Sequence, residues 1–177
     1  SFIEDRKFVS ALFMEFIAPN EDLHTFLEEK SIYWIDDFAI SNLSVVKTLK
    51  SLKPESDEYS RILPVFKDED DKDFAHNLLT RTLANSAEYK KYVVETASNW
   101  DEERISDMDQ LLMQMAISEL LNFETIPVKV TLNEYIELSK DYSSQKSKLF
   151  INGVIDKLAV RFKEEGKLKK LGRGLVE

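Results

Sequence analysis

The amino-acid sequence predicts an all-α protein built from about seven or eight helices. Apolar residues recur at helical spacing along most of the 177-residue chain, and no segment shows the strict alternation typical of a β-strand. Four prolines interrupt the apolar pattern, as prolines do at helix ends. A single glycine precedes residue 166, so the sequence offers few sites for tight turns inside its elements.

Residues 1–66 are predicted to form a helical N-terminal extension. The first helix covers about 2–17, and Asn20 is placed to cap a short helix that follows it. A longer helix is predicted over 33–52. The segment 53–66 contains two prolines and is predicted to be a linker.

Residues 67–162 are predicted to form the helical core. The acidic run 68–73 is interpreted as a solvated loop leading into a helix N-terminus, because it lacks the spaced ligands of a calcium loop. Ser106 and Asp109 match a capping box ahead of a helix that is apolar around most of its circumference, and this helix is predicted to be central. The other predicted helices cover 73–85, 89–97, 128–142 and 147–162.

Composition excludes several classes of protein. Hydrophobic residues make up 43% and charged residues 32% of the chain, which is typical of soluble folded proteins. No apolar run approaches the ~20 residues that span a bilayer, and no signal peptide is recognisable, so we expect a cytoplasmic protein without a membrane partner. The net charge of -9 argues against a general affinity for nucleic acid.

The sequence offers no candidate catalytic, metal or cofactor site. It contains no cysteine, which excludes disulfides and cysteine-based zinc sites. His24 and His76 are far apart and lack a helical ligand partner, so neither is predicted to bind metal. No glycine-rich loop is available to hold a phosphate group. We therefore predict that the protein uses no cofactor.

Gly153 lies in the middle of the last predicted helix, where glycine costs roughly 1 kcal/mol relative to alanine. At 100° per residue it lies nearly opposite the apolar stripe of that helix. The residues beside it on the predicted outer face are Lys146, Leu149, Phe150 and Lys157. An aromatic ring beside lysines suits contact with RNA. Alternatively, the glycine admits a neighbouring segment of its own chain.

The sequence "LLMQMAISELLNFETIPVKVTLNEYIELSKDYSSQKSKLFINGVIDKLA" resembles the C-terminal signature of the NusB family. Its motifs are a helix ending in the pair Glu119 and Leu120, a loop with Pro127, the helix "NEYIELSK" and the helix "FINGVIDKL". The upstream stretch "DFAHNLLTRTLAN" is similar to an earlier helix of the family. The resemblance covers about residues 67–160.

The resemblance implies an all-helical transcription antitermination factor that is not an enzyme. Members of the family pair with NusE, a small-subunit ribosomal protein, and bind the boxA element of ribosomal RNA transcripts within an RNA polymerase antitermination complex. The implied RNA-contact residues are Tyr142, Lys146 and Phe150, which extend the predicted face of Gly153 and Lys157. An acidic surface near the start of the central helix, with Glu103 and Asp109, is the implied contact for NusE.

Two features depart from the family pattern. The arginine-rich first helix of the family is missing, and residues 1–66 lack a counterpart in the compact members of the family. We therefore expect the C-terminal part of an enlarged member whose basic start lies upstream. Residues 163–177 are predicted to form a basic flexible tail. Two alternative functions stay open, the RNA-recognition domain of an rRNA methyltransferase and a helical protein-interaction module without an RNA role.

Overall fold

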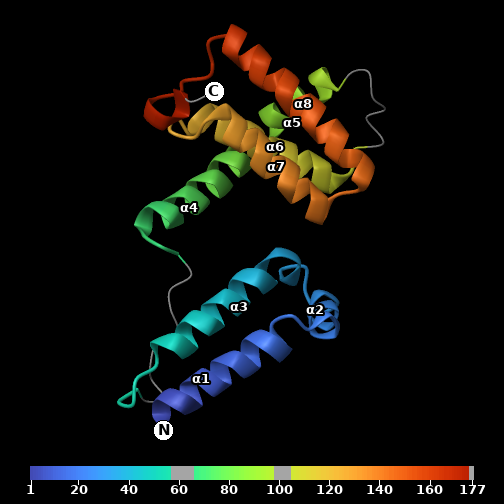
Figure 1. Ribbon diagram of the computed structural model, residues 1–177. Coiled ribbons are helices and arrows are strands. Elements are labelled where there is room, and N and C mark those ends of the chain that lie inside the picture. Colours follow the sequence, from blue (N-terminus) through green and yellow to red (C-terminus); the bar gives the residue numbers. More distant parts are fainter. Residues whose placement is uncertain (57–65, 98–104, 176–177) are drawn as a thin grey trace. The chain divides into compact units, whose positions relative to one another are not determined.

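The computed structural model describes residues 1–56, 66–97 and 105–175. Within these ranges it contains eight α-helices and no strand, which confirms the predicted all-α class (Figure 1). The described helices include none that is long and apolar enough to cross a bilayer. The chain divides into two compact units, which we call unit 1 (Ser1–Lys67) and unit 2 (Asp68–Glu177).

Unit 1 is a small helical layer in which α1 packs along α3 and α2 packs against α3. Its elements are α1 (Phe2–Leu12), a π-helical turn (Phe13–Ile17), α2 (Glu21–Glu28) and α3 (Trp34–Ser51). The predicted cap is confirmed, because Asn20 Oδ1 accepts a hydrogen bond from the Leu23 amide at 2.7 Å. None of the described apolar side chains of unit 1 is buried.

Unit 2 is a helical bundle with a continuous apolar core. Its helices are α4 (Glu69–Ala84), α5 (Ser86–Thr96), α6 (Asp107–Asn122), α7 (Val128–Tyr142) and α8 (Gln145–Glu164). The predicted central position of α6 is confirmed, since α6 packs against α4, α5, α7 and α8. The core is formed mainly by α5, α6 and α8 and includes Val93, Met113, Ile117, Leu120, Ile151, Ile155, Leu158 and Phe162.

Side-chain caps fix where three of these helices begin. Asp68 accepts a hydrogen bond from the Asp71 amide at 3.1 Å, so α4 begins at Glu69 and the acidic run forms its first turns instead of a preceding loop. Carboxylates favour this position because they face the positive end of the helix dipole. Ser106 caps α6 at 3.1 Å through the Asp109 amide, and Ser144 caps α8.

The segment after α8 folds back onto the bundle. Gly166 has a φ of +67°, which turns the chain away from the helix. The Leu171 amide then donates to the carbonyl oxygen of Glu124 in the loop between α6 and α7, at 2.8 Å. Gly174 is buried, and a Cβ atom there would lie 2.0 Å from that same oxygen. This docked segment, residues 167–175, differs from the predicted flexible tail because its backbone bonds to the bundle.

Candidate nucleic-acid interface

One face of α8 is open to solvent along most of the helix. Its exposed residues include Lys146, Leu149, Gly153, Asp156 and Lys157, and we call this surface the outer face of α8. The opposite side of the helix enters the core through Ile151, Ile155 and Leu158. The sequence prediction that Gly153 lies opposite the core stripe is therefore confirmed.

Gly153 itself is surrounded by open space. A Cβ atom built at this position meets no heavy atom within 4 Å. The alternative interpretation, in which the glycine admits a neighbouring segment of its own chain, receives no support from the described residues. Because glycine lacks a side chain, the backbone of α8 is uncovered at the middle of the outer face.

Phe150 does not lie on this face, and the prediction that placed it there was wrong. Its side chain is 6% exposed and belongs to the apolar core of unit 2. On the helical wheel Phe150 lies at the border between the two faces, about 40° from Lys146. Lys157 lies between these two positions and is closer than Phe150 to the solvent side. A long apolar ring at such a border gains free energy by turning inward, whereas the lysines beside it keep their charged ends in water.

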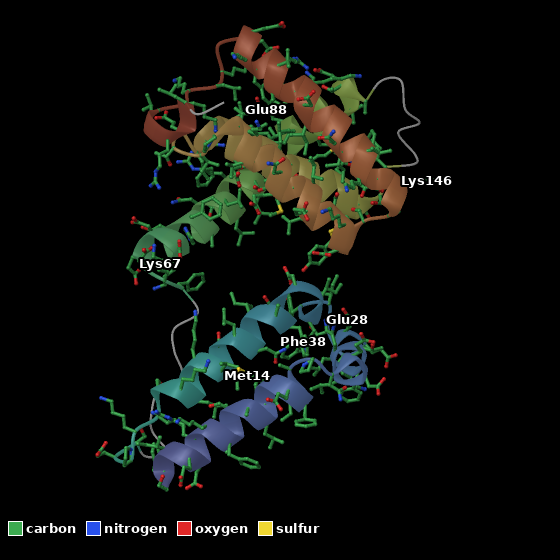
Figure 2. The ribbon with its side chains drawn as sticks, viewed as in Figure 1. Met14, Glu28, Phe38, Lys67, Glu88 and Lys146 are labelled. Carbon is green, nitrogen blue, oxygen red and sulfur yellow. The ribbon has the colours of Figure 1, made fainter. Side chains whose placement is uncertain are left out.

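The corner between α7 and α8 brings the other predicted RNA-contact residues together. Tyr142 ends α7 and is partly buried against the core, and Lys146 lies in the first turn of α8 at the same end of the bundle (Figure 2). Three residues separate the two, namely Ser143, the cap residue Ser144 and Gln145. The corner thus places one partly covered aromatic ring near the first lysine of the outer face.

Asp109 supports the α7–α8 corner through a hydrogen bond. Its carboxylate accepts a hydrogen bond from the Ser143 hydroxyl, and its side chain is 3% exposed. The prediction that Asp109 offers an accessible charge to a partner was therefore wrong. It lies in the first turn of a helix that is covered by the α7–α8 corner, so packing encloses the carboxylate. Glu103, the other predicted partner residue, lies outside the described residues.

The outer face carries a modest positive charge. Lys146 and Lys157 stand eleven residues apart, which is about three helical turns, with Asp156 as the nearest acidic neighbour on the face. Leu149 is 76% exposed between them, the highest value for a large apolar side chain in the described residues. The two lysines, the uncovered backbone and the exposed Leu149 side chain together suit contact with single-stranded RNA across an open surface.

A second polar cluster lies inside unit 2, where α6, α7 and the docked segment meet. The Tyr135 hydroxyl donates to the Glu119 carboxylate at 3.3 Å. Burial raises the pKa of the Glu119 carboxyl above its ordinary value, although Tyr135 and the nearby ammonium group of Lys170 act in the opposite direction. Burial lowers the pKa of Lys170, whose Nζ donates to the carbonyl oxygen of Phe123 at 2.9 Å.

The described residues contain no group of three histidine, aspartate or glutamate side chains that could hold a metal ion. His24 stacks on Phe38 with ring centroids 4.3 Å apart, and its Nε2 lies 3.1 Å from both the Trp34 carbonyl oxygen and a Glu28 carboxylate oxygen. This histidine has a packing role in unit 1.

Comparison with known proteins identifies the family. The family model described as the NusB family matches residues 39–160. The chain belongs to the NusB family. The matched range begins inside α3, upstream of the 67–160 range in which the motif resemblance is visible. The motifs that carry the resemblance all lie within residues 67–160. The similarity of residues 39–66 to the family is therefore seen only by comparison with the whole family model.

Relatives of this NusB-family chain are named transcription antitermination protein NusB. The relative from Salinibacter ruber is 40% identical over 114 residues, which are 64% of this chain and 71% of the relative. The relative from Chloroherpeton thalassium is 38% identical over 106 residues, 60% of this chain and 50% of the relative. The relative from Natranaerobius thermophilus is 35% identical over 86 residues, 49% of this chain and 62% of the relative. No solved structure matches the chain.

The family motifs serve the core more than the surface. Glu119 and Leu120, which carry part of the resemblance to the NusB family, are both buried, and so is Phe150. Sequence reasoning missed Ser143 as a residue of the candidate interface, although its place beside the capping serine of α8 could have revealed it. Leu149 was predicted to lie on the outer face but not as a contact residue.

Proposed function

We propose that this NusB-family chain acts as a transcription antitermination factor and binds boxA-type RNA of ribosomal transcripts together with NusE. The observation that supports this most strongly is the family match over residues 39–160, with relatives that are named transcription antitermination proteins. In this proposal the chain works by binding and not by catalysis. Its partners are the RNA, NusE and the RNA polymerase antitermination complex.

The proposed RNA contact is the outer face of α8 and the α7–α8 corner. Lys146 and Lys157 neutralise phosphates, while the uncovered backbone at Gly153 permits close approach of the strand. Tyr142 offers a partly buried aromatic ring at the corner. Phe150 has no direct contact in this proposal, because its ring fills the core beneath the face. It positions the helix that carries the contact.

The charge of the chain sets the expected strength of binding. With a net charge of -9 and two lysines on the outer face, the chain alone is expected to bind RNA weakly and to lose binding steeply as salt rises. NusE is expected to raise the affinity by supplying further contacts. The proposed NusE surface includes Glu103 but excludes the buried carboxylate of Asp109.

Fluorescence anisotropy with a labelled boxA RNA and a permuted RNA of the same composition tests the proposal. The expected result is preference for the boxA sequence that grows when NusE is added. Lys146→Ala with Lys157→Ala should lower the salt slope by about two, because each phosphate contact adds about one. Lys90→Ala, an exposed lysine on α5, is the matched control and should leave the slope unchanged. Equal binding of both RNAs in the presence of NusE would contradict the proposal.

A further inference from the structure

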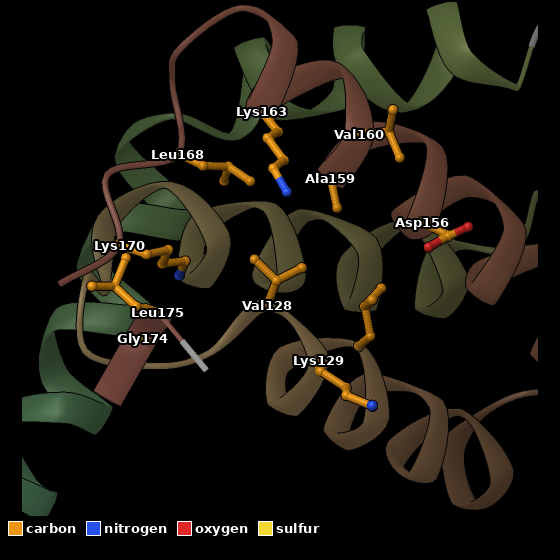
Figure 3. Close-up of a pocket in the computed structure, with 11 residues that line it drawn as sticks. Val128, Lys129, Asp156, Ala159, Val160, Lys163, Leu168, Lys170, Gly174 and Leu175 are labelled. Atoms are coloured by element: carbon orange, nitrogen blue, oxygen red, sulfur yellow. The ribbon is translucent and has the colours of Figure 1, made fainter. Parts of the chain in front are cut away.

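Unit 2 contains a cavity of about 410 Å³ that lies apart from the middle of the outer face of α8. It is bounded by the first turns of α7, the second half of α8 and the docked segment (Figure 3). Its volume falls within the range of roughly 300–1,000 Å³ that is typical of small-molecule sites. The cavity is therefore large enough for a ligand and is formed by a single unit of the chain.

The described residues that line the cavity are mostly aliphatic and include no aromatic ring. The apolar residues among them are Val128, Leu132, Ala159, Val160, Leu168 and Leu175. Leu168 and Leu175 belong to the docked segment, and their presence on the wall depends on the backbone bond between Leu171 and Glu124. An aliphatic wall favours an aliphatic ligand through the burial of apolar surface, and it offers no ring on which a base could stack.

The charged residues of the wall are predominantly cationic. Lys129 comes from α7, Lys163 from α8 and Lys170 from the docked segment, and Asp156 is the one acidic residue among the described residues of the wall. The side chain of Lys163 extends from α8 towards Val128, and Lys170 reaches the cavity from the side of the docked segment (Figure 3). Three lysines from three elements thus line an apolar space beside a single described carboxylate, which favours an anionic group at its edge.

We propose that this cavity binds a small aliphatic carboxylate of medium chain length, with its chain against the aliphatic wall and its carboxylate at the edge that the lysines line. Part of the wall comes from residues 168–175, which lie outside the range 39–160 matched by the NusB family model. The cavity shares only Asp156 with the outer face of α8, and the docked segment supplies the part of its wall that the family match does not include. Ligand binding stabilises the docked segment, because two of its leucines cover the ligand.

Titration of the ¹⁵N-labelled full chain with decanoate, followed by NMR, tests the proposal. The expected result is saturable chemical-shift change at Val128, Leu132, Val160 and Leu168, with slower amide hydrogen exchange at Leu171. Decanol tests the role of the carboxylate, and acetate tests the role of the chain. Both should bind at least about tenfold more weakly than decanoate, a loss of about 1.4 kcal/mol each.

Two exposed positions on α8 provide a matched pair of variants. Val160→Glu places a carboxylate on the cavity wall and should weaken decanoate binding by about tenfold or more. Leu149→Glu makes the same kind of change at an exposed position away from the cavity and should leave binding unchanged. Because both side chains are more than half exposed, both variants should fold. Absence of saturable binding, equal binding of decanol, or equal loss in the two variants would overturn the proposal.

Discussion

The two units of the chain use similar apolar residues in different ways. Phe162 in unit 2 is completely buried, whereas Phe8 in unit 1 is 68% exposed, although both lie within regular helices. Unit 2 surrounds a central helix with four others, and unit 1 forms only a thin layer of helices. Helix formation depends on local pattern and caps, but burial of an apolar face needs enough surrounding elements. Unit 2 is therefore the part of the chain that supplies a core.

The largest expected effect comes from the same substitution made once in each unit. Phe162→Ala should lower the free energy of unfolding of unit 2 by about 3–5 kcal/mol, because it removes a fully buried ring. Phe8→Ala should change stability by no more than about 0.5 kcal/mol. Urea unfolding of the full chain, followed by circular dichroism, measures both. A large loss for Phe8→Ala would show that unit 1 packs its apolar side chains against another surface.

The second prediction compares two glycines. Gly174→Ala should destabilise the docked segment by about 1–3 kcal/mol, since its Cβ would meet the Glu124 carbonyl oxygen at 2.0 Å. Gly153→Ala should stabilise the protein by up to about 1 kcal/mol, because no atom lies within 4 Å and alanine favours a helix. Amide hydrogen exchange at Leu171 reports the first effect. Unchanged exchange in Gly174→Ala would contradict the docked position of this segment.

The third prediction concerns the corner that supports the outer face of α8. Asp109→Ala leaves the Ser143 hydroxyl without its partner and should cost about 1–3 kcal/mol of unfolding free energy. Asp156→Ala, at an exposed position of α8, should cost less than about 0.5 kcal/mol. Thermal unfolding of both variants measures the difference. If the two variants lose equal stability, Asp109 is not the anchor of the corner.

The smallest expected effect is a pH dependence. Burial raises the pKa of the Glu119 carboxyl in the folded state, so the unfolded chain releases this proton at a lower pH. The protonated carboxyl therefore contributes stability at low pH, and this contribution is lost as pH rises through the folded pKa. Glu119→Gln should remove that loss, so the variant gains stability relative to the natural chain as pH rises from 4.5. Glu15→Gln, at an exposed position in unit 1, is the control. If the free energy of unfolding of the natural chain and of Glu119→Gln changed in parallel with pH, the proposed contribution of Glu119 would be contradicted.

Sequence reasoning predicted the local features of the fold well. The start of α2 follows from Asn20 and the start of α6 from Ser106, because a side-chain cap is a local interaction. The range predicted for α7 agrees with the structure at both ends. The inward stripe of α8 and the exposed position of Gly153 follow from helical periodicity alone.

Apart from the acidic run 68–73, the features that failed depend on contacts between distant segments. The burial of Asp109 depends on Ser143, which lies 34 residues away. The inward position of Phe150 depends on the space between α8 and its neighbours, which a helical wheel does not contain. The docking of residues 167–175 depends on the loop between α6 and α7. Each error in the candidate site therefore arose where tertiary packing decides between two locally allowed positions.

The substitution Gly153→Leu tests whether the outer face of α8 contacts RNA. Gly153→Ala is the control, since it adds helix propensity without bulk. Affinity for boxA RNA is measured in the presence of NusE, alongside the free energy of unfolding of each variant. Gly153→Leu should bind RNA at least about tenfold more weakly than Gly153→Ala, and the two variants should be equally stable. Equal RNA affinity of the two variants would contradict the proposed contact.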